Sequence, residues 1–370
     1  MKMPKDPTLI IAGGGTGGHI LAGVAVADAW CARIRTTSDK SPKVLFVGAR
    51  GGIEEKLVPR AGYALELLSI GSLKRVSLAR RLKTMLQLPI SMLRSARILL
   101  ERRPIAVVGV GGYASGPLVL MARLLGWLWG GQVAILEQNA VPGFTNRILG
   151  KFAHRIFSAF PGTEEYFPAG KVLVTGNPVR SAIVPLGPAR SEPFTLFIFG
   201  GSQGAVGINS LVIEALPHLE DLRSRLRFIH QTGELDHERV SKAHREAGTQ
   251  ARVEKFIYDM PAAYSESSMV ISRAGSSTLS ELAAVGRAAV LIPLPSAADN
   301  HQEKNARVFA DAGAALVLPQ KQSTGKDLAA LIRKMMNDSS QLSSMEWAIK
   351  SFYRPAAAKD LVNHLMGAAV

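Results

Sequence analysis

Near its N-terminus the chain reads Thr8-Leu9-Ile10-Ile11-Ala12-Gly13-Gly14-Gly15-Thr16-Gly17-Gly18-His19. The apolar run at 8–11 is typical of a buried strand, and the apolar residues from 20 to 32 recur at helical spacing. A glycine loop between a strand and a helix leaves backbone N–H groups at the helix N-terminus, where they bind phosphate. Because His19 stands where the loop meets the helix, a side chain that titrates near neutral pH is predicted beside an anion site.

The glycines at 13, 15 and 18 also have the spacing of the dinucleotide fingerprint, which would indicate a nicotinamide or flavin enzyme. That fingerprint expects an acidic residue at the end of the second strand to hold a ribose. The second predicted strand, 43–47, instead ends in Gly48-Ala49-Arg50-Gly51-Gly52. A phosphate-bearing ligand of another kind is therefore favoured, with a glycine turn that binds nothing as the second alternative.

The amino-acid composition and net charge limit the kinds of ligand and partner that the protein can bind. The 370 residues suffice for two domains, and 47% hydrophobic residues with 35 glycines fit a loop-rich α/β protein. The single cysteine, Cys31, excludes a disulfide scaffold and a cysteine metal cluster. The formal net charge of +15 requires an anionic partner, which is nucleic acid, anionic lipid or a phosphorylated substrate. No zinc-finger spacing or aromatic-basic stacking motif is present, so no nucleic acid is expected, and the absence of an apolar leader predicts a cytoplasmic protein.

A basic and apolar stretch runs from Lys74 to Arg103. It mixes nine basic residues with one acid, Glu101, and with apolar residues at helical spacing. This mixture is typical of a surface that lies on anionic lipid headgroups. Two core-packed helices with a solvated basic face would give the same pattern, so both interpretations stay open.

The helix expected from 118 to 130 carries Trp127 and Trp129, and tryptophan is typical of a lipid interface. If the two tryptophans lie at such an interface, this helix and the basic stretch would form one membrane-facing surface. A transmembrane span over 118–136 is less favoured, because glycines interrupt it and 132–136 has the pattern of a strand.

A second glycine loop, Gly109-Val110-Gly111-Gly112-Tyr113-Ala114-Ser115-Gly116-Pro117, follows the apolar strand 105–108 and precedes a helix. Tyr113 and Ser115 bring hydroxyl donors to this loop. Two such loops at the carboxyl ends of strands in one sheet predict a shared anion site. The strand at 132–136 then ends in Glu137-Gln138-Asn139, at the edge where parallel sheets bind ligands, although Asn139 is equally suited to a turn.

A segment with four prolines, 177–193, has little periodicity and is the expected domain linker. After it, the apolar strand 194–199 and a third loop, Gly200-Gly201-Ser202-Gln203-Gly204-Ala205, restart the same architecture. The chain is therefore expected to be α/β, with two Rossmann-like doubly wound domains that face each other.

Further along, in the block from Met269 to Glu281, a strand meets a turn of small residues and then a helix whose first turn offers N–H groups and hydroxyls. Glu281 lies one helical turn after Thr278, where a carboxylate suits the two hydroxyls of a ribose; helix capping is the structural alternative. No Asp-x-Asp and no His-x-x-x-His pattern is present, so a metal is not expected. A leaving diphosphate would be neutralised by helix N-termini and by cations such as Arg180.

Taken together, these blocks resemble the MurG family, the UDP-N-acetylglucosamine transferases that act on the lipid-linked muramyl-pentapeptide in peptidoglycan synthesis. The three glycine loops, Glu137-Gln138-Asn139, Gly176-Asn177-Pro178-Val179-Arg180 and the block from 272 to 281 match in order and cover most of the chain. The resemblance implies the two-domain GT-B glycosyltransferase fold. It places an acceptor and membrane-associating domain at 1–178, a donor-binding domain at 179–352, and a C-terminal helix at about 353–370 that packs back on the first domain.

The resemblance also implies the ligands of each site and a peripheral position on the cytoplasmic face of the inner membrane, without any cofactor. Arg180 and Ser202 would hold the donor diphosphate, Glu281 the ribose, the Ile257 backbone the uracil, and Asn139 with Gln302 the sugar. The implied UDP-N-acetylglucosamine site is Thr16, Gly17, Gly18, Asn139, Arg180, Ser202, Ile257, Ser276, Ser277, Thr278, Leu279, Ser280, Glu281 and Gln302. The implied acceptor diphosphate site is Gly14, Gly15, Gly111, Gly112, Tyr113 and Ser115.

The reaction expected from this resemblance is an inverting, metal-independent transfer to the acceptor 4-hydroxyl. His19 is the candidate general base, with Tyr113 and Asn139 as helpers, and positioning of the acceptor diphosphate is the alternative role for His19. Leu136 stands where the family usually has a histidine, which weakens any scheme that uses that histidine as base. A UDP-N-acetylglucosamine epimerase of similar build and a non-enzymatic membrane-surface scaffold are the alternative functions.

Overall fold

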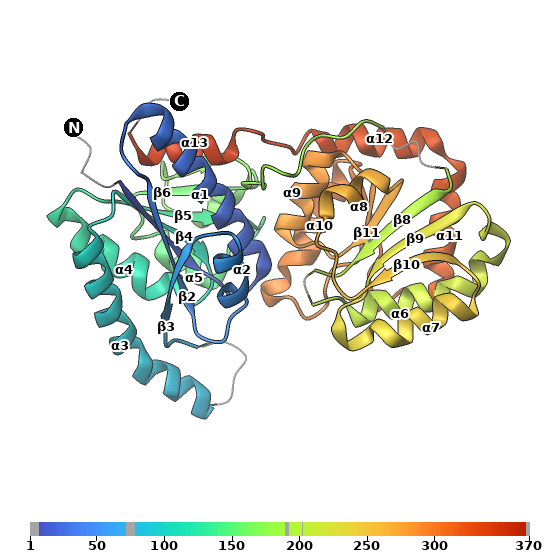
Figure 1. Cartoon of the computed structure of the whole chain (residues 1–370), viewed down its shortest axis with the longest axis horizontal. Helices are drawn as coiled ribbons and strands as arrows, with labels where there is room; N and C mark the ends of the chain where they lie inside the picture. The colour runs from blue at the N-terminus through green and yellow to red at the C-terminus, as the bar shows by residue number, and fades with distance from the viewer. Residues whose placement is uncertain (1–6, 72–77, 189–191, 202, 368–370) are drawn as a thin grey trace. The chain divides into compact units, whose positions relative to one another are not determined.

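The computed structural model describes residues 7–71, 78–188, 192–201 and 203–367, without the side chains of 78–83. Contacts divide the chain into two compact units, residues 1–180 with 354–370, and residues 181–353 (Figure 1). Ser202 of the predicted donor site lies outside the described residues, as do Lys74 and Arg75 of the basic stretch.

The first unit is built on a seven-stranded parallel sheet with the order β3-β2-β1-β4-β5-β6-β7. The order reverses between β1 and β4, which makes the gap between them the topological switch point where open α/β sheets bind ligands. The strands are β1 (Thr8–Gly13), β2 (Lys43–Ala49), β3 (Ala64–Leu68), β4 (Ala106–Gly111), β5 (Gln132–Glu137), β6 (Arg155–Ser158) and β7 (Val172–Val174).

Helices cover both faces of this sheet, because alternate residues of each strand enter different cores. Leu9 and Ile11 pack under α1 (Gly17–Thr37), α2 (Glu54–Arg60) and α13 (Ala357–Leu365). Ile10 and Ala12 pack on the other face, under α3 (Leu78–Arg102), α4 (Ser115–Leu125) and α5 (Phe144–Leu149). Two short 3-10 helices, η1 (Gly126–Leu128) and η2 (Thr163–Tyr166), complete the described part of this unit.

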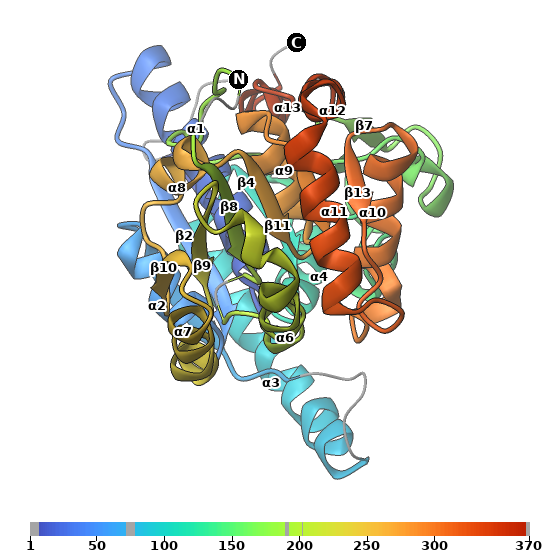
Figure 2. The same ribbon diagram turned by 90° about the vertical axis from the view of Figure 1, so that its right-hand side faces the viewer.

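The second unit has a six-stranded parallel sheet with the order β10-β9-β8-β11-β12-β13, which reverses between β8 and β11 (Figure 2). The strands are β8 (Phe194–Phe199), β9 (Leu226–Gln231), β10 (Gln250–Glu254), β11 (Met269–Ser272), β12 (Ala289–Leu291) and β13 (Ala315–Val317). The helices are α6 (Val206–Ala215), α7 (His237–Glu246), α8 (Met260–Glu266), α9 (Ser276–Val285), α10 (His301–Asp311), α11 (Gly325–Asn337) and α12 (Ser339–Lys350), with 3-10 turns η3 (Leu216–Leu222), η4 (Glu234–Asp236) and η5 (Ala298–Asn300). Two doubly wound parallel sheets confirm the predicted fold class.

Two helices differ from the sequence-based expectation. The part of the basic stretch that the structure describes forms one long helix, α3, rather than a pair. The helix expected to reach residue 130 ends at Leu125, because the chain tightens into η1 and Gly131 closes a turn with its N–H on the Gly126 carbonyl at 3.0 Å. Within the described ranges no helix is both long and apolar enough to cross a membrane.

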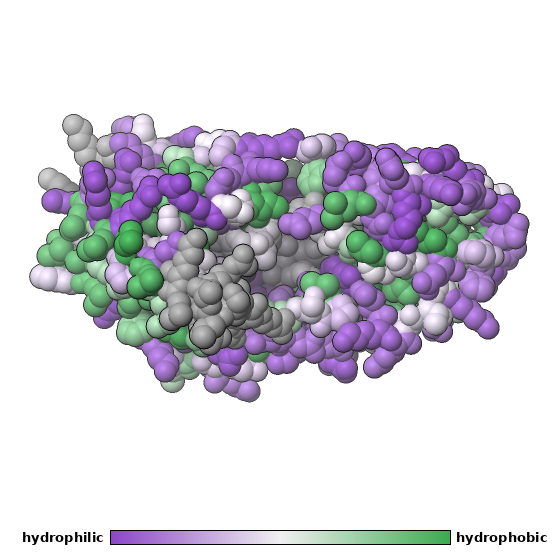
Figure 3. All heavy atoms as spheres, turned by 90° about the horizontal axis from the view of Figure 1, so that it is seen from below, coloured by the Kyte–Doolittle hydropathy of each residue, from purple (hydrophilic) through white to green (hydrophobic). Residues whose placement is uncertain are grey.

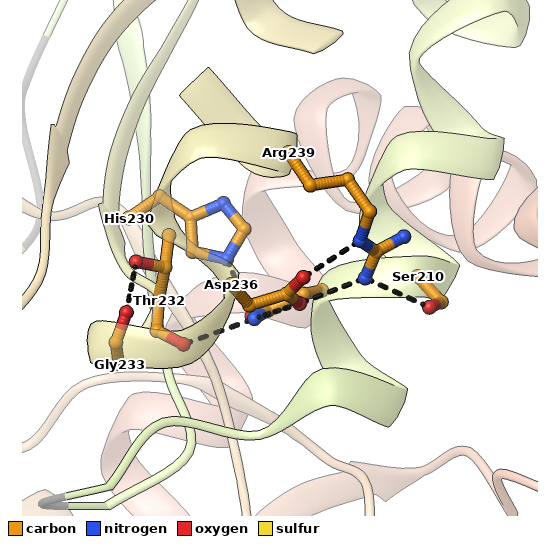
Figure 4. A network of polar contacts seen from close by, with 7 residues as sticks. Ser210, His230, Thr232, Gly233, Asp236 and Arg239 are labelled. Carbon is orange, nitrogen blue, oxygen red and sulfur yellow. Dashed lines mark hydrogen bonds and ion pairs between the residues drawn. The ribbon is translucent and has the colours of Figure 1, made fainter. Parts of the chain in front are cut away.

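A buried polar network ties the second sheet to its helices (Figure 4). His230 of β9 lies 3.1 Å from the Asn209 side-chain oxygen of α6, and the Asn209 amide donates to Asp236 at 2.7 Å. Arg239 of α7 donates to the other Asp236 oxygen at 2.6 Å. On its other side His230 meets His244 of α7 at 3.3 Å. The network satisfies groups that burial would otherwise leave without hydrogen bonds.

Candidate functional site

The first glycine loop joins β1 to α1 at the switch point of the first sheet. Gly13 and Gly15 have φ of 154° and 81°, a backbone region that residues with a Cβ rarely adopt. Thr16 caps α1, because its side-chain oxygen accepts the His19 N–H at 3.4 Å. The N–H groups of Gly17 and Gly18 precede the first intrahelical hydrogen bond and lie at the N-terminus of α1, the end at which helices generally bind anions.

The first two glycine loops lie directly against each other, as the sequence predicted. The Gly14 N–H donates to the Gly111 carbonyl at 3.1 Å. A Cβ at Gly112 would lie 2.4 Å from the Gly14 carbonyl oxygen, so this approach requires glycine. Ser115 takes a different place from the predicted one: it is fully buried and its hydroxyl donates to the Ala12 carbonyl at 2.7 Å. Ser115 therefore joins the loops, and we do not retain it as a phosphate ligand, whereas the Tyr113 side chain is 41% exposed.

His19 is half-buried at the start of α1, with its ring against the second loop. Its Nδ1 lies 3.1 Å from the Gly14 carbonyl oxygen. A carbonyl oxygen only accepts, so Nδ1 carries the proton and the lone pair of the neutral ring is on Nε2. A Cβ at Gly111 would lie 2.9 Å from Nε2, which explains why glycine faces the ring.

Sequence reasoning missed Glu54, which is fully buried under the first loop. Its two carboxylate oxygens accept the N–H groups of Gly15 at 3.0 Å and Ala49 at 2.9 Å. A Cβ at Gly14 or Gly52 would lie 2.0 or 2.2 Å from this carboxylate. The signal in the sequence is the cluster of glycines from Gly48 to Gly52, shortly before this acid. From the sequence alone, this segment indicates only a strand end that lacks an acidic residue. Because Gly15 donates to Glu54, its N–H is already engaged and does not point to a phosphate.

Glu137 organises the loop after β5. Its carboxylate accepts the Asn139 N–H at 2.8 Å, the Asn139 side-chain amide at 3.2 Å, the Asn146 amide at 2.9 Å and the Gly143 N–H at 3.2 Å. Burial raises the pKa of Glu137 above its usual range, against these hydrogen bonds. Asn139 is thus more than a turn residue, since its side chain is oriented by a buried carboxyl group.

In the second unit, Gln231 at the end of β9 links the third glycine loop to Ile257. Its amide donates to the Gly201 carbonyl at 2.7 Å, and its oxygen accepts the Ile257 N–H at 3.1 Å. Ile257 itself is buried. The Ile257 N–H therefore donates within the protein. Its carbonyl oxygen is the backbone group that we consider as an acceptor for a nucleobase.

The helix predicted after the small-residue turn is α9, which begins at Ser276 with Gly275 at its N-cap. Leu279 has a fully buried side chain, and its N–H donates to the Gly275 carbonyl at 3.0 Å. It offers no group to a ligand, so we remove Leu279 from the site. The N–H groups of Ser276, Ser277 and Thr278 precede this bond and lie in the first turn of α9, the end at which helices generally bind anions.

Glu281 is the sixth residue of α9, three positions beyond the N3 site that a capping-box glutamate occupies, so its position does not fit the capping alternative. Its side chain is only 7% exposed, and the Tyr264 hydroxyl donates to one of its oxygens at 3.2 Å. Ser280 instead turns back on its own helix, where its hydroxyl donates to the Ser276 carbonyl at 2.9 Å.

Gln302 and Arg180 complete the predicted donor residues that the structure describes. Gln302 lies in the first turn of α10, and its side-chain oxygen accepts the Leu294 N–H at 2.9 Å, which orients its amide group. Arg180 is half-buried and is the last residue of the first unit's N-terminal segment. Among the described residues, no group of three or more histidine, cysteine, aspartate or glutamate side chains is placed to hold a metal ion.

Two doubly wound parallel sheets, each with a glycine loop at its switch point, give the GT-B fold, and the family models place the chain among the glycosyltransferases that have this fold. The family model of the glycosyltransferase family 28 N-terminal domain matches residues 9–158, and that of the C-terminal domain matches residues 195–361.

The relatives narrow this class further. A protein of Syntrophus aciditrophicus (strain SB) is 44% identical over 97% of this chain and 98% of its own length, and it is named UDP-N-acetylglucosamine--N-acetylmuramyl-(pentapeptide) pyrophosphoryl-undecaprenol N-acetylglucosamine transferase. The crystal structure of Acinetobacter baumannii MurG is similar with a TM-score of 0.75 and 32% identity, over 98% of this chain and 99% of that one. The chain belongs to the MurG family of glycosyltransferases.

The structure of UDP-GlcNAc 2-epimerase from Neisseria meningitidis bound to UDP-GlcNAc is also similar, with a TM-score of 0.69 over 98% of this chain and all of that one. The identity is only 13%, so this likeness shows the shared fold alone.

Proposed function

We propose that this enzyme transfers N-acetylglucosamine from UDP-N-acetylglucosamine to the 4-hydroxyl of the N-acetylmuramyl sugar in an undecaprenyl-diphosphate-linked muramyl-pentapeptide. The observation that carries this proposal is the 44% identity, over 97% of the chain, to a transferase named for these substrates. The contacts in the two units are consistent with this activity, because both present helix N-termini and glycine loops at the edges where parallel sheets bind ligands.

The second unit is proposed to bind the donor. The first turn of α9 would meet the diphosphate through the N–H groups of Ser276, Ser277 and Thr278. Glu281, oriented by Tyr264 at 3.2 Å, would accept hydroxyl protons of the ribose. The Ile257 carbonyl would accept the uracil N–H, because the Ile257 N–H already donates to Gln231.

The remaining donor contacts follow from the family resemblance. The Gln302 amide, held by the Leu294 N–H, would donate to a hydroxyl or carbonyl of the sugar. Arg180 and Ser202 would hold the diphosphate, and Asn139 the sugar. The N-terminal turn of α1 at Thr16, Gly17 and Gly18 would add backbone donors.

The first unit is proposed to bind the acceptor diphosphate at the paired loops, with Gly14, Gly111, Gly112 and Tyr113 around it. The acceptor oxygen forms a bond to the donor anomeric carbon from the face opposite UDP, which gives a β1→4 link. The bond from that carbon to the UDP oxygen breaks, and its electron pair leaves with UDP. His19 Nε2 takes the proton of the acceptor hydroxyl, because Nδ1 already carries a proton for the Gly14 carbonyl.

Membrane contact is proposed through the outer face of α3 and the neighbouring η1. Leu86 and Leu93 are 76% and 73% exposed, and they lie about three helical turns and one helical turn before the exposed cation Arg97. A helix that packed only on its own core would bury such leucines, so this favours the lipid-facing interpretation of the basic stretch. Figure 3 shows apolar side chains gathered on the part of the first unit that carries α3 and α4.

The tryptophan pair contributes unequally to this surface. Trp127 is 75% exposed and extends it. Trp129 is only half-exposed and its indole N–H donates to the Pro104 carbonyl at 2.9 Å, so we leave it out of the lipid contact.

Binding to vesicles tests this membrane-facing surface. The double variant Leu86→Gln with Leu93→Gln should lower the fraction of protein bound to anionic vesicles. The control variant Trp347→Gln, at a 79% exposed site in the second unit, should not lower it.

The activity test mixes purified protein, UDP-N-acetylglucosamine and the lipid-diphosphate muramyl acceptor. Release of UDP that depends on both substrates, together with a disaccharide product, supports the transfer. Conversion of the nucleotide sugar without an acceptor supports an epimerase instead. Absence of UDP-sugar binding in a thermal shift supports a non-enzymatic scaffold.

A further inference from the structure

Glu54 and His19 contact opposite ends of the same peptide group. The peptide between Gly14 and Gly15 donates its N–H to Glu54 Oε2 at 3.0 Å, and its carbonyl oxygen lies 3.1 Å from His19 Nδ1. A carboxylate is therefore connected to the imidazole through one peptide bond. This arrangement is built from two segments far apart in the chain, since Glu54 lies 39 residues after Gly15.

We infer that Glu54 is a positioning residue that acts through the Gly14–Gly15 peptide to keep His19 in the Nδ1–H tautomer. A hydrogen bond from the N–H to a carboxylate polarises the peptide and makes its carbonyl a stronger acceptor. A stronger acceptor favours the ring that donates from Nδ1, which places the lone pair on Nε2. The consequence for turnover rests on the proposed role of His19 as base.

The surroundings of Glu54 are shaped for this one orientation. Its other oxygen accepts the Ala49 N–H at 2.9 Å, so both oxygens are fixed. Glycine at 14, 48 and 52 leaves the space that the side chain occupies, because a Cβ at any of them would lie 2.0 to 2.6 Å from Glu54. A buried carboxylate with two backbone donors cannot be replaced by an amide without turning an N–H toward one of these donors.

The direct test measures the tautomer of His19 in the full-length protein without substrates. Long-range proton–nitrogen correlation of protein labelled with ¹⁵N-histidine reports which ring nitrogen carries the proton, and His19→Gln identifies the His19 signals. We expect the Nδ1–H tautomer in the native protein and a measurable shift toward Nε2–H in Glu54→Gln. An Nε2–H tautomer in the native protein, or identical spectra for Glu54→Gln, overturns the inference.

A matched control and a second variant protect the test from a simple folding defect. Glu55 is exposed and accepts the Gly51 N–H at 2.7 Å, so Glu55→Gln makes the same chemical change one residue away and should leave the His19 signals unchanged. Gly52→Ala keeps the carboxylate but displaces Oε2, which lies 2.2 Å from the added Cβ. It should move the tautomer in the same direction as Glu54→Gln, and an unchanged tautomer in folded Gly52→Ala counts against the inference.

The kinetics of the single and double variants of Glu54 and His19 distinguish a positioning role of Glu54 from a general structural defect. Glu54→Gln should lower kcat by about 10-fold or more, yet by less than removal of the base itself, with the KM for UDP-N-acetylglucosamine unchanged. In the His19→Gln background it should lower kcat no further, because Glu54 acts through His19. An equal loss in both backgrounds overturns the inference. If His19→Gln turns over normally, the proposed base fails, while the tautomer experiment still decides the role of Glu54.

Discussion

Each unit connects a histidine to a carboxylate through an amide group, and the two arrangements differ in what the second ring nitrogen meets. In the first unit the Gly14–Gly15 peptide lies between Glu54 and His19. In the second unit the Asn209 side chain lies between Asp236 and His230. His19 is half-buried, whereas His230 is fully buried and its other nitrogen meets His244 at 3.3 Å.

The difference in burial goes with a difference in role, because the fully buried His230 can only stabilise the fold, whereas the half-buried His19 is the proposed base. Burial lowers the pKa of His230 to about 3 and that of His244 to about 4, so both rings stay neutral at the pH of the cell. A ring that stays neutral and meets only protein groups exchanges no proton with a substrate. The second network therefore holds β9 to α6 and α7, while the first presents a half-buried ring.

The largest effect is expected from His19→Ala. Loss of a general base lowers kcat by about 10²- to 10⁴-fold, and the affinity for UDP should change little, because the donor contacts proposed above lie mainly in the second unit. Steady-state kinetics with a UDP-binding measurement checks this. Turnover within about twofold of the native enzyme would show that His19 is not the base. The His19 and His230 networks would then not differ in catalytic role.

His230→Ala should act on stability instead. It leaves a cavity and takes away the buried partner of Asn209 and His244, which costs about 2–4 kcal/mol of unfolding free energy. Urea unfolding followed by circular dichroism measures the loss. Activity per folded molecule should remain near the native value, and a fall in kcat similar to that of His19→Ala would mean that the two networks do not differ in role.

The buried histidine pair should also make stability depend on pH. The folded-state pKa of each ring lies below the unfolded value of about 6.5, so the unfolded chain binds more protons at lower pH. Stability from this source is complete above pH 6.5 and falls below it, by about 1.4 kcal/mol per pH unit for each ring, down to about pH 4. Urea unfolding at pH 7 and pH 5 should show the fall, and the slope should be smaller in His244→Gln.

The smallest effect is expected at the rim of the second network. The Arg239 guanidinium holds the pKa of Asp236 below its usual range, at a distance of 2.6 Å. Because Arg239 is half-exposed, Arg239→Ala should cost only about 0.5–1 kcal/mol. A loss of several kcal/mol in urea unfolding would show that Arg239 belongs to the buried core of the network rather than to its rim.

The sequence by itself determined the local units of this protein. Apolar runs that break into glycine and restart at helical spacing predicted β1 with α1, β4 with α4 and β11 with α9, because strand ends and helix starts depend on neighbouring residues. The repetition of this unit after residue 194 predicted two doubly wound sheets, and the order of the motifs carried the resemblance to the MurG family, to which the chain belongs.

Only the tertiary structure decided which side chains meet across those units. Glu54 reaches the first loop because β2 pairs beside β1, and Ser115 turns inward because β4 lies on the other side of β1. The burial of Leu279 and the inward turn of Trp129 also depend on packing partners distant in the chain. Local periodicity sets where a strand ends, but strand order and packing set what its neighbours contribute, and this is why a strand end that lacks an acid in sequence holds a carboxylate in space.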